Sequence, residues 1–349
     1  MKSDPHTLFD NLDLLIDDGL ILVDPNREVV RANQSSLSTL GTRILNQPLE
    51  YFLRHPDINQ AIDNIMKFGE TSPLTYLRYD DVQHEYVVKF APFPDDHCLV
   101  RMNDVTARIN FDKIRSEFVA NVSHELRSPL TTLTGFIETL QTTAADDPEA
   151  RIEFLAIMQE EAARMQRLID SLLSLSRVES QEHLHPNDDV QVTDMVKEVF
   201  ELMAHRAVQC DMRIELINNL PQKLNPIVLG NRDEMSEVLH NLLDNAIKYG
   251  EENSRVKLIL ETDGSNKNVK ISVVNSGDGI DEIHLPRLTE RFYRIDKART
   301  RKLGGTGLGL AIVKHIMNRH RGRLQITSKG DGENVFTVYF PILVSKFLK

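Results

Sequence analysis

The stretch NVSHELRSPL, residues 121–130, places an ionisable pair just ahead of a proline inside a predicted helix. An imidazole nitrogen becomes a nucleophile when a neighbouring carboxylate orients or deprotonates the other ring nitrogen, and Glu125 directly follows His124. At about 100° per residue, an inward-facing Val122 puts His124 on the solvent side of the helix. Pro129 lacks an N–H, so it bends the helix near the histidine. Taken alone, a surface His-Glu pair is more often ordinary solvated helix than a catalytic site.

A second stretch, NLLDNAIKYG, carries amides and a cation on one predicted helix. Asn241 and Asn245 lie one turn apart and are followed by Lys248 and Tyr249. Amide oxygens suit Mg²⁺, a lysine ammonium can meet phosphate charge, and a tyrosine ring can stack on a base. The alternative is an amphipathic helix that ends at Gly250, and this segment alone does not decide between the two.

Glycines gather in two later stretches. VVNSGDGI ends a predicted strand with Gly277 and Gly279, which would allow a flat ligand to approach the backbone closely. GGTGLGLAIVKHI places Gly305, Gly307 and Gly309 where a helix begins, and free N–H groups there can bind an anion. A Rossmann site is not indicated, because these glycines come late in an antiparallel context.

Together these motifs resemble those of sensor histidine kinases. SHELRSPL resembles the phospho-acceptor box, and NLLDNAIKYG, VVNSGDGI, ERFYRID and GGTGLGLAIV resemble, in this order, the N, G1, F and G2 boxes of the GHKL (Bergerat) ATP-binding domain. Within the family, FVANVSHELRSPLTTLTGFIETL and LSLSRVE look most like the phosphate-regulon (PhoR-type) sensors, which implies phosphate-responsive signalling. The resemblance implies ATP and Mg²⁺ as cofactors.

The resemblance also implies a role for each matching residue. His124 would be autophosphorylated with Glu125 as the assisting base, while Asn245 would bind the magnesium ion. Phe292 and Tyr293 would anchor a lid formed by the basic stretch KARTRKLGG. The catalytic residues implied are His124, Glu125 and Ser128. The ATP-binding residues implied are Asn241, Asn245, Lys248, Tyr249, Asn275, Gly277, Gly279, Arg294, Gly305, Thr306, Gly307, Leu308 and Gly309, with Arg294 reaching the terminal phosphate.

Two positions depart from the family pattern. Asn275 stands where the family usually has Asp, the acceptor for the adenine amino group, so its amide oxygen would have to face the base. Ser128 stands where Thr is more usual in the acceptor box. Relatives use Glu125 and this hydroxyl to position water for dephosphorylating the partner, and Ser keeps the hydroxyl with more rotamer freedom. Phosphatase activity is therefore less strongly implied than kinase activity.

Two helical runs must position the histidine. Apolar residues recur at steps of three and four in both, which predicts an antiparallel hairpin with one inward stripe on each helix. The first stripe is Val119, Val122, Leu126, Leu130, Leu133, Ile137 and Leu140, and the second is Leu155, Met158, Ala162, Met165, Ile169 and Leu172. Because Phe118, Phe136, Ile157 and Leu168 flank these stripes, we expect two copies to form a four-helix bundle. The alternative is burial against a neighbouring domain.

The flanking regions predict an α+β chain of three domains. Residues 1–103 contain GLILVDPNREVVRAN, which predicts strand, turn and strand, and HEYVVKFAPF and HCLVRM, which predict paired strands; this region resembles a PAS sensor domain. Residues 104–182 hold a signalling helix and the dimerisation hairpin. Residues 183–349 predict a GHKL α/β sandwich, because two strand pairs with Gly- and Asn-containing turns alternate with helices.

Composition limits the class of protein. A chain of 349 residues exceeds one ordinary core, and its net charge of −11 argues against direct nucleic-acid binding. Cys98 and Cys210 are far apart, so neither a disulfide framework nor a zinc site is predicted. The apolar runs fall short of a membrane span, and the N-terminus lacks the regions of a signal peptide. We expect a soluble, cytoplasmic chain, although PhoR-type sensors are normally anchored and the sequence could begin after such an anchor.

The resulting prediction is an ATP-dependent protein-histidine kinase. It would autophosphorylate His124 and pass the phosphoryl group to an aspartate on the receiver domain of a response regulator, with the hairpin as docking site. Two alternatives stay open at this point. One is a PAS-containing sensory scaffold whose nucleotide-binding domain is inactive, which the Asn275 departure favours. The other is a GHKL-type ATPase or serine kinase acting on another protein.

Overall fold

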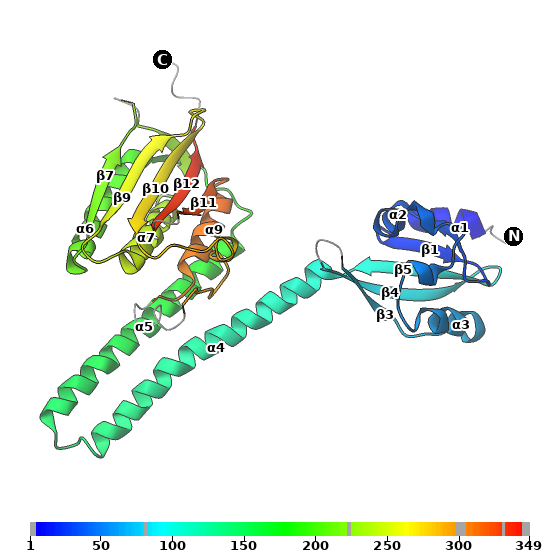
Figure 1. Ribbon diagram of the computed structural model, residues 1–349, viewed down its shortest axis with the longest axis horizontal. Coiled ribbons are helices and arrows are strands. Elements are labelled where there is room, and N and C mark those ends of the chain that lie inside the picture. Colours follow the sequence, from blue (N-terminus) through cyan, green and yellow to red (C-terminus); the bar gives the residue numbers. More distant parts are fainter. Residues whose placement is uncertain (1–4, 80–82, 222–224, 297–304, 330–331, 344–349) are drawn as a thin grey trace. The chain divides into compact units, whose positions relative to one another are not determined.

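The computed structural model describes residues 5–79, 83–221, 225–296, 305–329 and 332–343. The chain divides into two compact units, one ending at Val119 and the other beginning at Ala120, and each is described by itself. Figure 1 shows the elements of both units. Among the described residues, no helix is long and apolar enough to cross a membrane.

The first unit is built on a five-stranded antiparallel sheet with the order β2-β1-β5-β4-β3. Its elements are α1 (Pro5–Asp13), β1 (Gly19–Val23), β2 (Val29–Ala32), α2 (Gln34–Leu40), η1 (Thr42–Ile44), η2 (Leu49–Tyr51), α3 (Ile58–Phe68), β3 (Leu74–Tyr79), β4 (Gln83–Phe93) and β5 (His97–Asp104). The predicted turn between the first two strands is confirmed, because Asp24 Oδ1 accepts hydrogen bonds from the backbone N–H groups of Asn26 and Glu28. The predicted pairing of β4 with β5 is also confirmed.

Two long helices form the hairpin. Helix α4 (Thr106–Gln141) runs unbroken through Pro129, which is buried, and α5 (Pro148–Ser180) follows. The start of α5 is well defined, because Asp147 Oδ1 accepts hydrogen bonds from the N–H groups of Glu149 and Ala150. A proline at the first position of α5 suits a site where no N–H is needed.

The prediction of the inward-facing stripes is wrong for several residues. Val119, Leu130, Ile137, Leu155 and Ile169 are all exposed, with Val119 at 57% and Leu130 at 55%. Instead Leu168 is buried, and the rings of Phe136 and Phe154 meet across the hairpin with centroids 5.0 Å apart. The apolar arc on each helix is wider than one partner helix can cover, and periodicity does not specify which edge of that arc faces inward.

The last part of the chain is an α/β sandwich, as predicted. Its elements are β6 (Asp188–Gln191), α6 (Val192–Gln209), β7 (Arg213–Asn218), β8 (Ile227–Gly230), α7 (Arg232–Tyr249), β9 (Arg255–Thr262), β10 (Asn268–Ser276), η3 (Leu285–Arg287), α9 (Gly309–Arg319), β11 (Arg323–Ser328) and β12 (Glu333–Pro341). The sheet has the order β11-β12-β10-β9-β7, in which only the β7-β9 pair is parallel. Helices α6, α7 and α9 cover one face of it (Figure 1).

Packing against this sheet fixes the orientation of α7. Its buried apolar side chains recur at steps of three and four, which is the spacing of one helix face, and they are Met235, Val238, Leu239, Leu242, Leu243, Ala246 and Ile247. Asn241 and Asn245 flank this face and are partly exposed. The hydrophobic face therefore holds the two amides along one edge of the helix.

Candidate active site

His124 lies on α4 with its side chain exposed, as the helical phase predicts. The adjacent Glu125 is not free, because two arginines hold its carboxylate. Arg294 forms a bidentate ion pair with Glu125, in which Nη1 lies 3.2 Å from Oε1 and Nη2 lies 3.3 Å from Oε2. Arg164 Nη2 donates to the same Oε2 at 3.3 Å. Arg294, for which the family resemblance implies contact with a terminal phosphate, thus binds the residue next to the predicted acceptor in this structure.

A cavity of about 540 Å³ lies beside this ion pair, and Arg294 is part of its wall. Most of the predicted nucleotide residues line it, namely Asn241, Asn245, Lys248, Tyr249, Asn275, Gly279, Arg294, Thr306, Gly307 and Gly309. The volume falls within the usual range for small-molecule sites, about 300–1,000 Å³. Segments separated by more than a hundred residues therefore meet around one nucleotide-sized space.

Three of the predicted ATP-binding residues do not line the cavity. Gly277 is absent from the wall, and a Cβ at this position would collide with the carbonyl oxygen of Tyr249, so this glycine lets the end of β10 pack against the end of α7. The side chain of Leu308 is fully buried in the core. Gly305 also lies outside the lining, and residues 297–304 of the predicted lid are outside the described residues.

The turn before α9 depends on glycine. Gly307 has a φ of +71°, and a Cβ there would lie 2.9 Å from Phe292 Cα. The backbone N–H of Phe292 donates to Gly307 O at 2.8 Å, so the F-box segment and the glycine turn are held together. A Cβ at Gly309, the first residue of α9, would lie 2.7 Å from Asn241 Oδ1. The turn consequently places the start of α9 directly against α7.

Among the described residues, some polar side chains of α7 already have hydrogen-bond or ion-pair partners, and that of Asn245 does not. Asn241 Nδ2 donates to Glu237 O at 2.9 Å, and Lys248 Nζ lies 2.7 Å from Asp244 Oδ2. Within the described ranges, the Asn245 amide takes part in no hydrogen bond, so its oxygen is available in the cavity. Those ranges also contain no cluster of three or more His, Cys, Asp or Glu able to hold a metal. An amide as the protein ligand fits Mg²⁺, which keeps water and phosphate as its other ligands.

Two asparagines of the cavity lining are cross-strand partners where β10 pairs with β12. Asn275 is only 2% exposed, and its Nδ2 makes a long 3.4 Å hydrogen bond to Ser276 O. Asn334, its cross-strand partner, is held firmly: Oδ1 accepts from Ser328 Oγ at 2.7 Å and Nδ2 donates to Asp278 O at 3.0 Å. Sequence reasoning missed Asn334, because only the strand register brings it beside Asn275.

Helix α5 also contributes to the cavity. Arg167, Asp170 and Ser171 lie in its wall, and none of them was predicted. The only signal in the sequence was their place on the second helix of the hairpin, roughly forty residues after His124. The hairpin and the α/β sandwich therefore share one site within the second unit.

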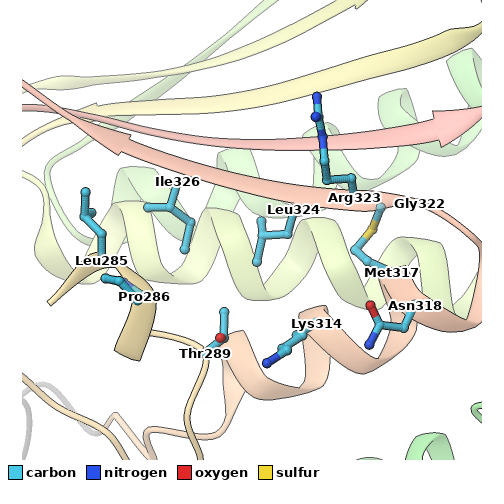
Figure 2. A pocket seen from close by; sticks show the side chains of 10 residues that line it. All are labelled: Leu285, Pro286, Thr289, Lys314, Met317, Asn318, Gly322, Arg323, Leu324 and Ile326. Atoms are coloured by element: carbon cyan, nitrogen blue, oxygen red, sulfur yellow. The ribbon is translucent and has the colours of Figure 1, made fainter. Parts of the chain in front are cut away.

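A second cavity, of about 420 Å³, lies between η3, α9 and β11 (Figure 2). Its walls are largely apolar, with Leu285, Pro286, Met317, Leu324 and Ile326 among them. None of the predicted site residues lines it. The chemistry predicted from the sequence thus belongs to the first cavity.

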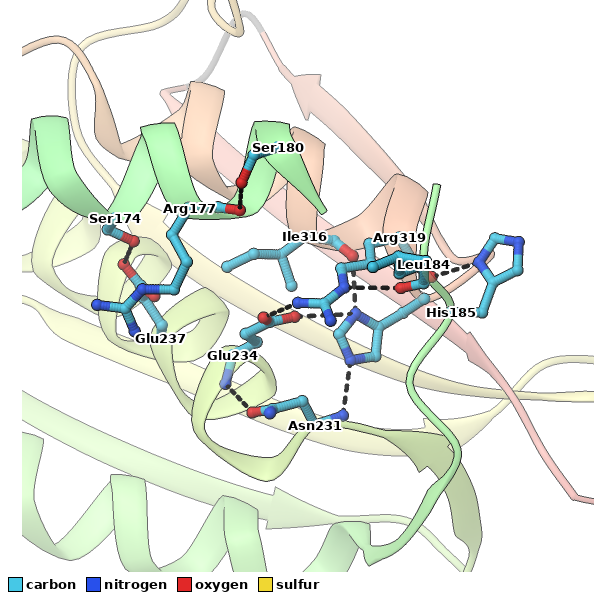
Figure 3. Close-up of polar contacts among 11 residues, drawn as sticks. Ser174, Arg177, Ser180, Leu184, His185, Asn231, Glu234, Glu237, Ile316 and Arg319 are labelled. Carbon is cyan, nitrogen blue, oxygen red and sulfur yellow. Dashed lines mark hydrogen bonds and ion pairs between the residues drawn. The ribbon is translucent and has the colours of Figure 1, made fainter. Parts of the chain in front are cut away.

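A buried polar network supports the opposite end of α7 (Figure 3). Glu234 pairs with Arg319, whose Nε donates to Leu184 O at 2.9 Å. His320 Nε2 accepts from the Asn231 N–H at 3.0 Å, so Nδ1 carries the proton that it donates to Ile316 O at 2.8 Å. Burial raises the pKa of Glu234 and lowers the pKa of His320, since both charged forms lose hydration.

Comparison with known proteins gives consistent matches along the chain. Residues 114–181 match the His Kinase A (phospho-acceptor) domain, and residues 230–344 match the histidine kinase-, DNA gyrase B- and HSP90-like ATPase family. The phosphate regulon sensor protein PhoR of Pseudomonas aeruginosa is 32% identical over 326 residues, which cover 93% of this chain and 72% of that protein. The sensor histidine kinase WalK of Bacillus subtilis is 32% identical over 327 residues, 91% of this chain and 52% of WalK.

A solved structure shares the fold over most of the chain. Histidine kinase ThkA, in its complex with response regulator protein TrrA, aligns with a TM-score of 0.52 and 22% identity and covers 93% of this chain and 96% of that one. At this identity the alignment supports the fold alone.

Proposed function

Because the chain belongs to the sensor histidine kinases of two-component systems, we propose that its reaction is the transfer of the γ-phosphoryl group of ATP to His124. From there the group would pass to an aspartate on the receiver domain of a response regulator. The alternative of a scaffold with an inactive kinase domain is not favoured, since this chain matches both the phospho-acceptor and the ATPase families and its relatives include the sensor histidine kinase WalK.

The observation that carries this proposal is the ion pair between Glu125 and Arg294. It joins the residue beside the exposed imidazole to the wall of the cavity, although the two partners are 169 residues apart in sequence. The acceptor helix therefore contacts a residue of the cavity wall, and closeness of the acceptor to the nucleotide is a condition for phosphoryl transfer.

The proposed step is an in-line displacement. One imidazole nitrogen of His124 forms a bond to the γ-phosphorus, the bond from that phosphorus to the β,γ-bridging oxygen breaks, and ADP leaves. The proton on the other imidazole nitrogen passes to the Glu125 carboxylate, which leaves a neutral phosphohistidine ring. Arg294 and Lys248 would stabilise charge on the transferred group, and the N–H groups at the start of α9 would bind phosphate oxygens.

Asn245 is the residue that would hold the magnesium ion, and when bound this ion would neutralise phosphate charge. Tyr249 would stack on the adenine, and Asn275 would present its amide to the edge of the base. The Ser128 hydroxyl lies on α4 one turn after His124, which supports a role in positioning water for phosphatase activity towards the regulator.

We further propose three functional domains, at residues 1–103, 104–182 and 183–349. The boundaries are supported by the end of β5 at Asp104 and the end of α5 at Ser180. A homodimer through the hairpin is supported by apolar side chains that one chain leaves exposed on α4 and α5, such as Leu130, Leu155 and Ile169. A PAS-like role for the first domain is supported by its sheet, whose last strand leads into α4.

The test is labelling with γ-³²P-ATP. The parent should acquire label that is labile in acid and stable in alkali, and His124→Gln should abolish it. A parent that binds ATP yet stays unlabelled, or label that survives His124→Gln, would refute the proposal. Transfer from the labelled protein to each response regulator of the host then identifies the partner.

A further inference from the structure

Glu125 is shared between two arginines that come from different parts of the second unit. The side chains involved are largely withdrawn from water, with exposed fractions of 5% for Arg294, 13% for Arg164 and 18% for Glu125. Arg164 lies on α5, the antiparallel neighbour of α4, and therefore belongs to the hairpin. Arg294 belongs to the segment that packs on the glycine turn, since a Cβ at Gly307 would lie 3.3 Å from Arg294 Nε.

Arg294, a residue of the cavity wall, has an unused donor. Its Nε is buried and has no hydrogen-bond partner among the described residues, although both Nη atoms donate to Glu125. A buried guanidinium N–H without an acceptor carries a free-energy cost, and an anion in the adjoining cavity would remove that cost. The orphaned Nε therefore points to a second, anionic partner for Arg294.

Two guanidinium groups compete with the imidazole for the Glu125 carboxylate. Oε1 accepts from Arg294, and Oε2 accepts from both Arg294 and Arg164, so three of the roughly four lone-pair positions of the carboxylate are occupied in this state. A base must offer a free lone pair to the imidazole N–H before it can take the proton. If Arg294 leaves, Oε1 becomes free while Arg164 still holds Oε2.

We propose that Arg164 is a positioning residue for phosphorylation of His124, and that Arg294 exchanges between Glu125 and the terminal phosphate of the bound nucleotide. This inference rests on the proposed function. Nucleotide binding draws Arg294 onto the phosphate and frees one Glu125 oxygen, which accepts the imidazole proton as the new N–P bond forms. Arg164 keeps the carboxylate on the hairpin during this exchange. Without nucleotide, Arg294 holds the base in an unreactive pair.

The kinetic test compares Arg164→Ala, Arg164→Lys and the control Arg151→Ala in the full chain under single-turnover conditions. A positioned general base contributes roughly 10²–10⁴-fold to a rate, so Arg164→Ala should lower the labelling rate at saturating ATP by about tenfold or more. ATP affinity should stay within about twofold, since Arg164 does not line the cavity. Lysine should restore most of the rate, because a single nitrogen makes the contact to Glu125. The side chain of Arg151, on the same helix, donates to Ala145 O near the start of α5, far along the chain from Arg164, and its loss should be neutral.

Repeating the Arg164→Ala measurement in a chain that also carries Glu125→Gln separates a positioning role from a merely structural one. If Arg164 acts through Glu125, then Arg164→Ala should cause no further loss in a Glu125→Gln chain. An equal loss in both backgrounds, or a loss no larger than that of Arg151→Ala, would overturn the positioning role.

Binding tests the exchange without turnover. Glu125→Gln removes the charge that competes for Arg294, so it should tighten the binding of AMP-PNP with Mg²⁺ by about threefold or more and leave ADP binding unchanged, because ADP lacks the terminal phosphate. Unchanged or weaker AMP-PNP binding would exclude the exchange. Should the parent carry no label on His124, the proposed function fails, and this binding measurement still decides whether Glu125 and phosphate compete.

Discussion

Replacing Arg319 by methionine removes one partner of the buried ion pair at the start of α7 (Figure 3). The side chains of Glu234 and Arg319 are each only 10% exposed, and Glu234 Oε2 already lacks a hydrogen-bond partner among the described residues. Leaving one charge of such a pair uncompensated costs about 3–5 kcal/mol. Loss of the bond from Arg319 Nε to Leu184 O adds roughly 1 kcal/mol. We therefore expect this part of the chain to lose about 4–6 kcal/mol of stability.

The size of the loss should depend on pH. Burial raises the pKa of Glu234 and the Arg319 charge opposes that rise, so removing Arg319 lets the pKa climb further. A folded-state pKa above the unfolded value means that the folded state binds the extra proton. Stability then falls as pH rises through that interval. The deficit of Arg319→Met should accordingly be larger at pH 8 than at pH 5.

Hydrogen exchange of the full chain, read by mass spectrometry on peptides of α7 and α9, measures this local stability. Arg232→Met is a matched control, because Arg232 also pairs with a glutamate, Glu198, but both side chains are largely exposed and such pairs contribute about 0–1 kcal/mol. A double variant, Glu234→Leu with Arg319→Met, should recover to within about 1–2 kcal/mol of the parent, since no buried charge is left. A loss for Arg319→Met no larger than that of the control, or a double variant as unstable as the single one, would refute the reasoning.

Three further outcomes follow from the same structure. The stability of the parent α/β sandwich should fall between pH 7.5 and 5.5, because the pKa of His320 is lowered in the folded state and the unfolded chain takes up the proton first. His320→Gln should make this fall smaller, since glutamine does not titrate, and urea unfolding at both pH values measures the difference. Gly307→Ala should lower the free energy of unfolding by about 1–3 kcal/mol and weaken ATP binding, since Gly307 has a positive φ and a Cβ there would collide with Phe292. Calorimetric titration with ATP measures the binding, and Gly264→Ala is the control that should bind normally, because a Cβ at Gly264 meets nothing within 4 Å. Asn275→Asp should raise the preference for ATP over GTP by about tenfold in competition binding, because an amide can face either an amino group or a carbonyl, whereas a carboxylate only accepts; an unchanged ratio would remove Asn275 from base recognition.

The sequence alone provided the candidate residues and their order along the chain, and the resemblance of their motifs to the histidine-kinase boxes supplied the chemistry. His124 with Glu125, the amides of α7 and the glycines before α9 each lie within one short stretch, so local spacing was enough to group them. The strand pairs β9-β10 and β11-β12 were predictable for the same reason, since their turns are local.

Only the tertiary structure decided which of these groups meet. The pairing of Glu125 with Arg294 spans 169 residues, and the placing of Asn334 beside Asn275 depends on the register of β10 against β12. The sequence predicts a ligand contact for Gly277 as for the other glycines, but in the structure the backbone at the end of α7 occupies the space beside Gly277. The stripes of the hairpin failed for a related reason, because periodicity defines an apolar arc and packing selects the part of it that is buried. Local spacing determines what a residue could do, and long-range packing determines which partner it finds.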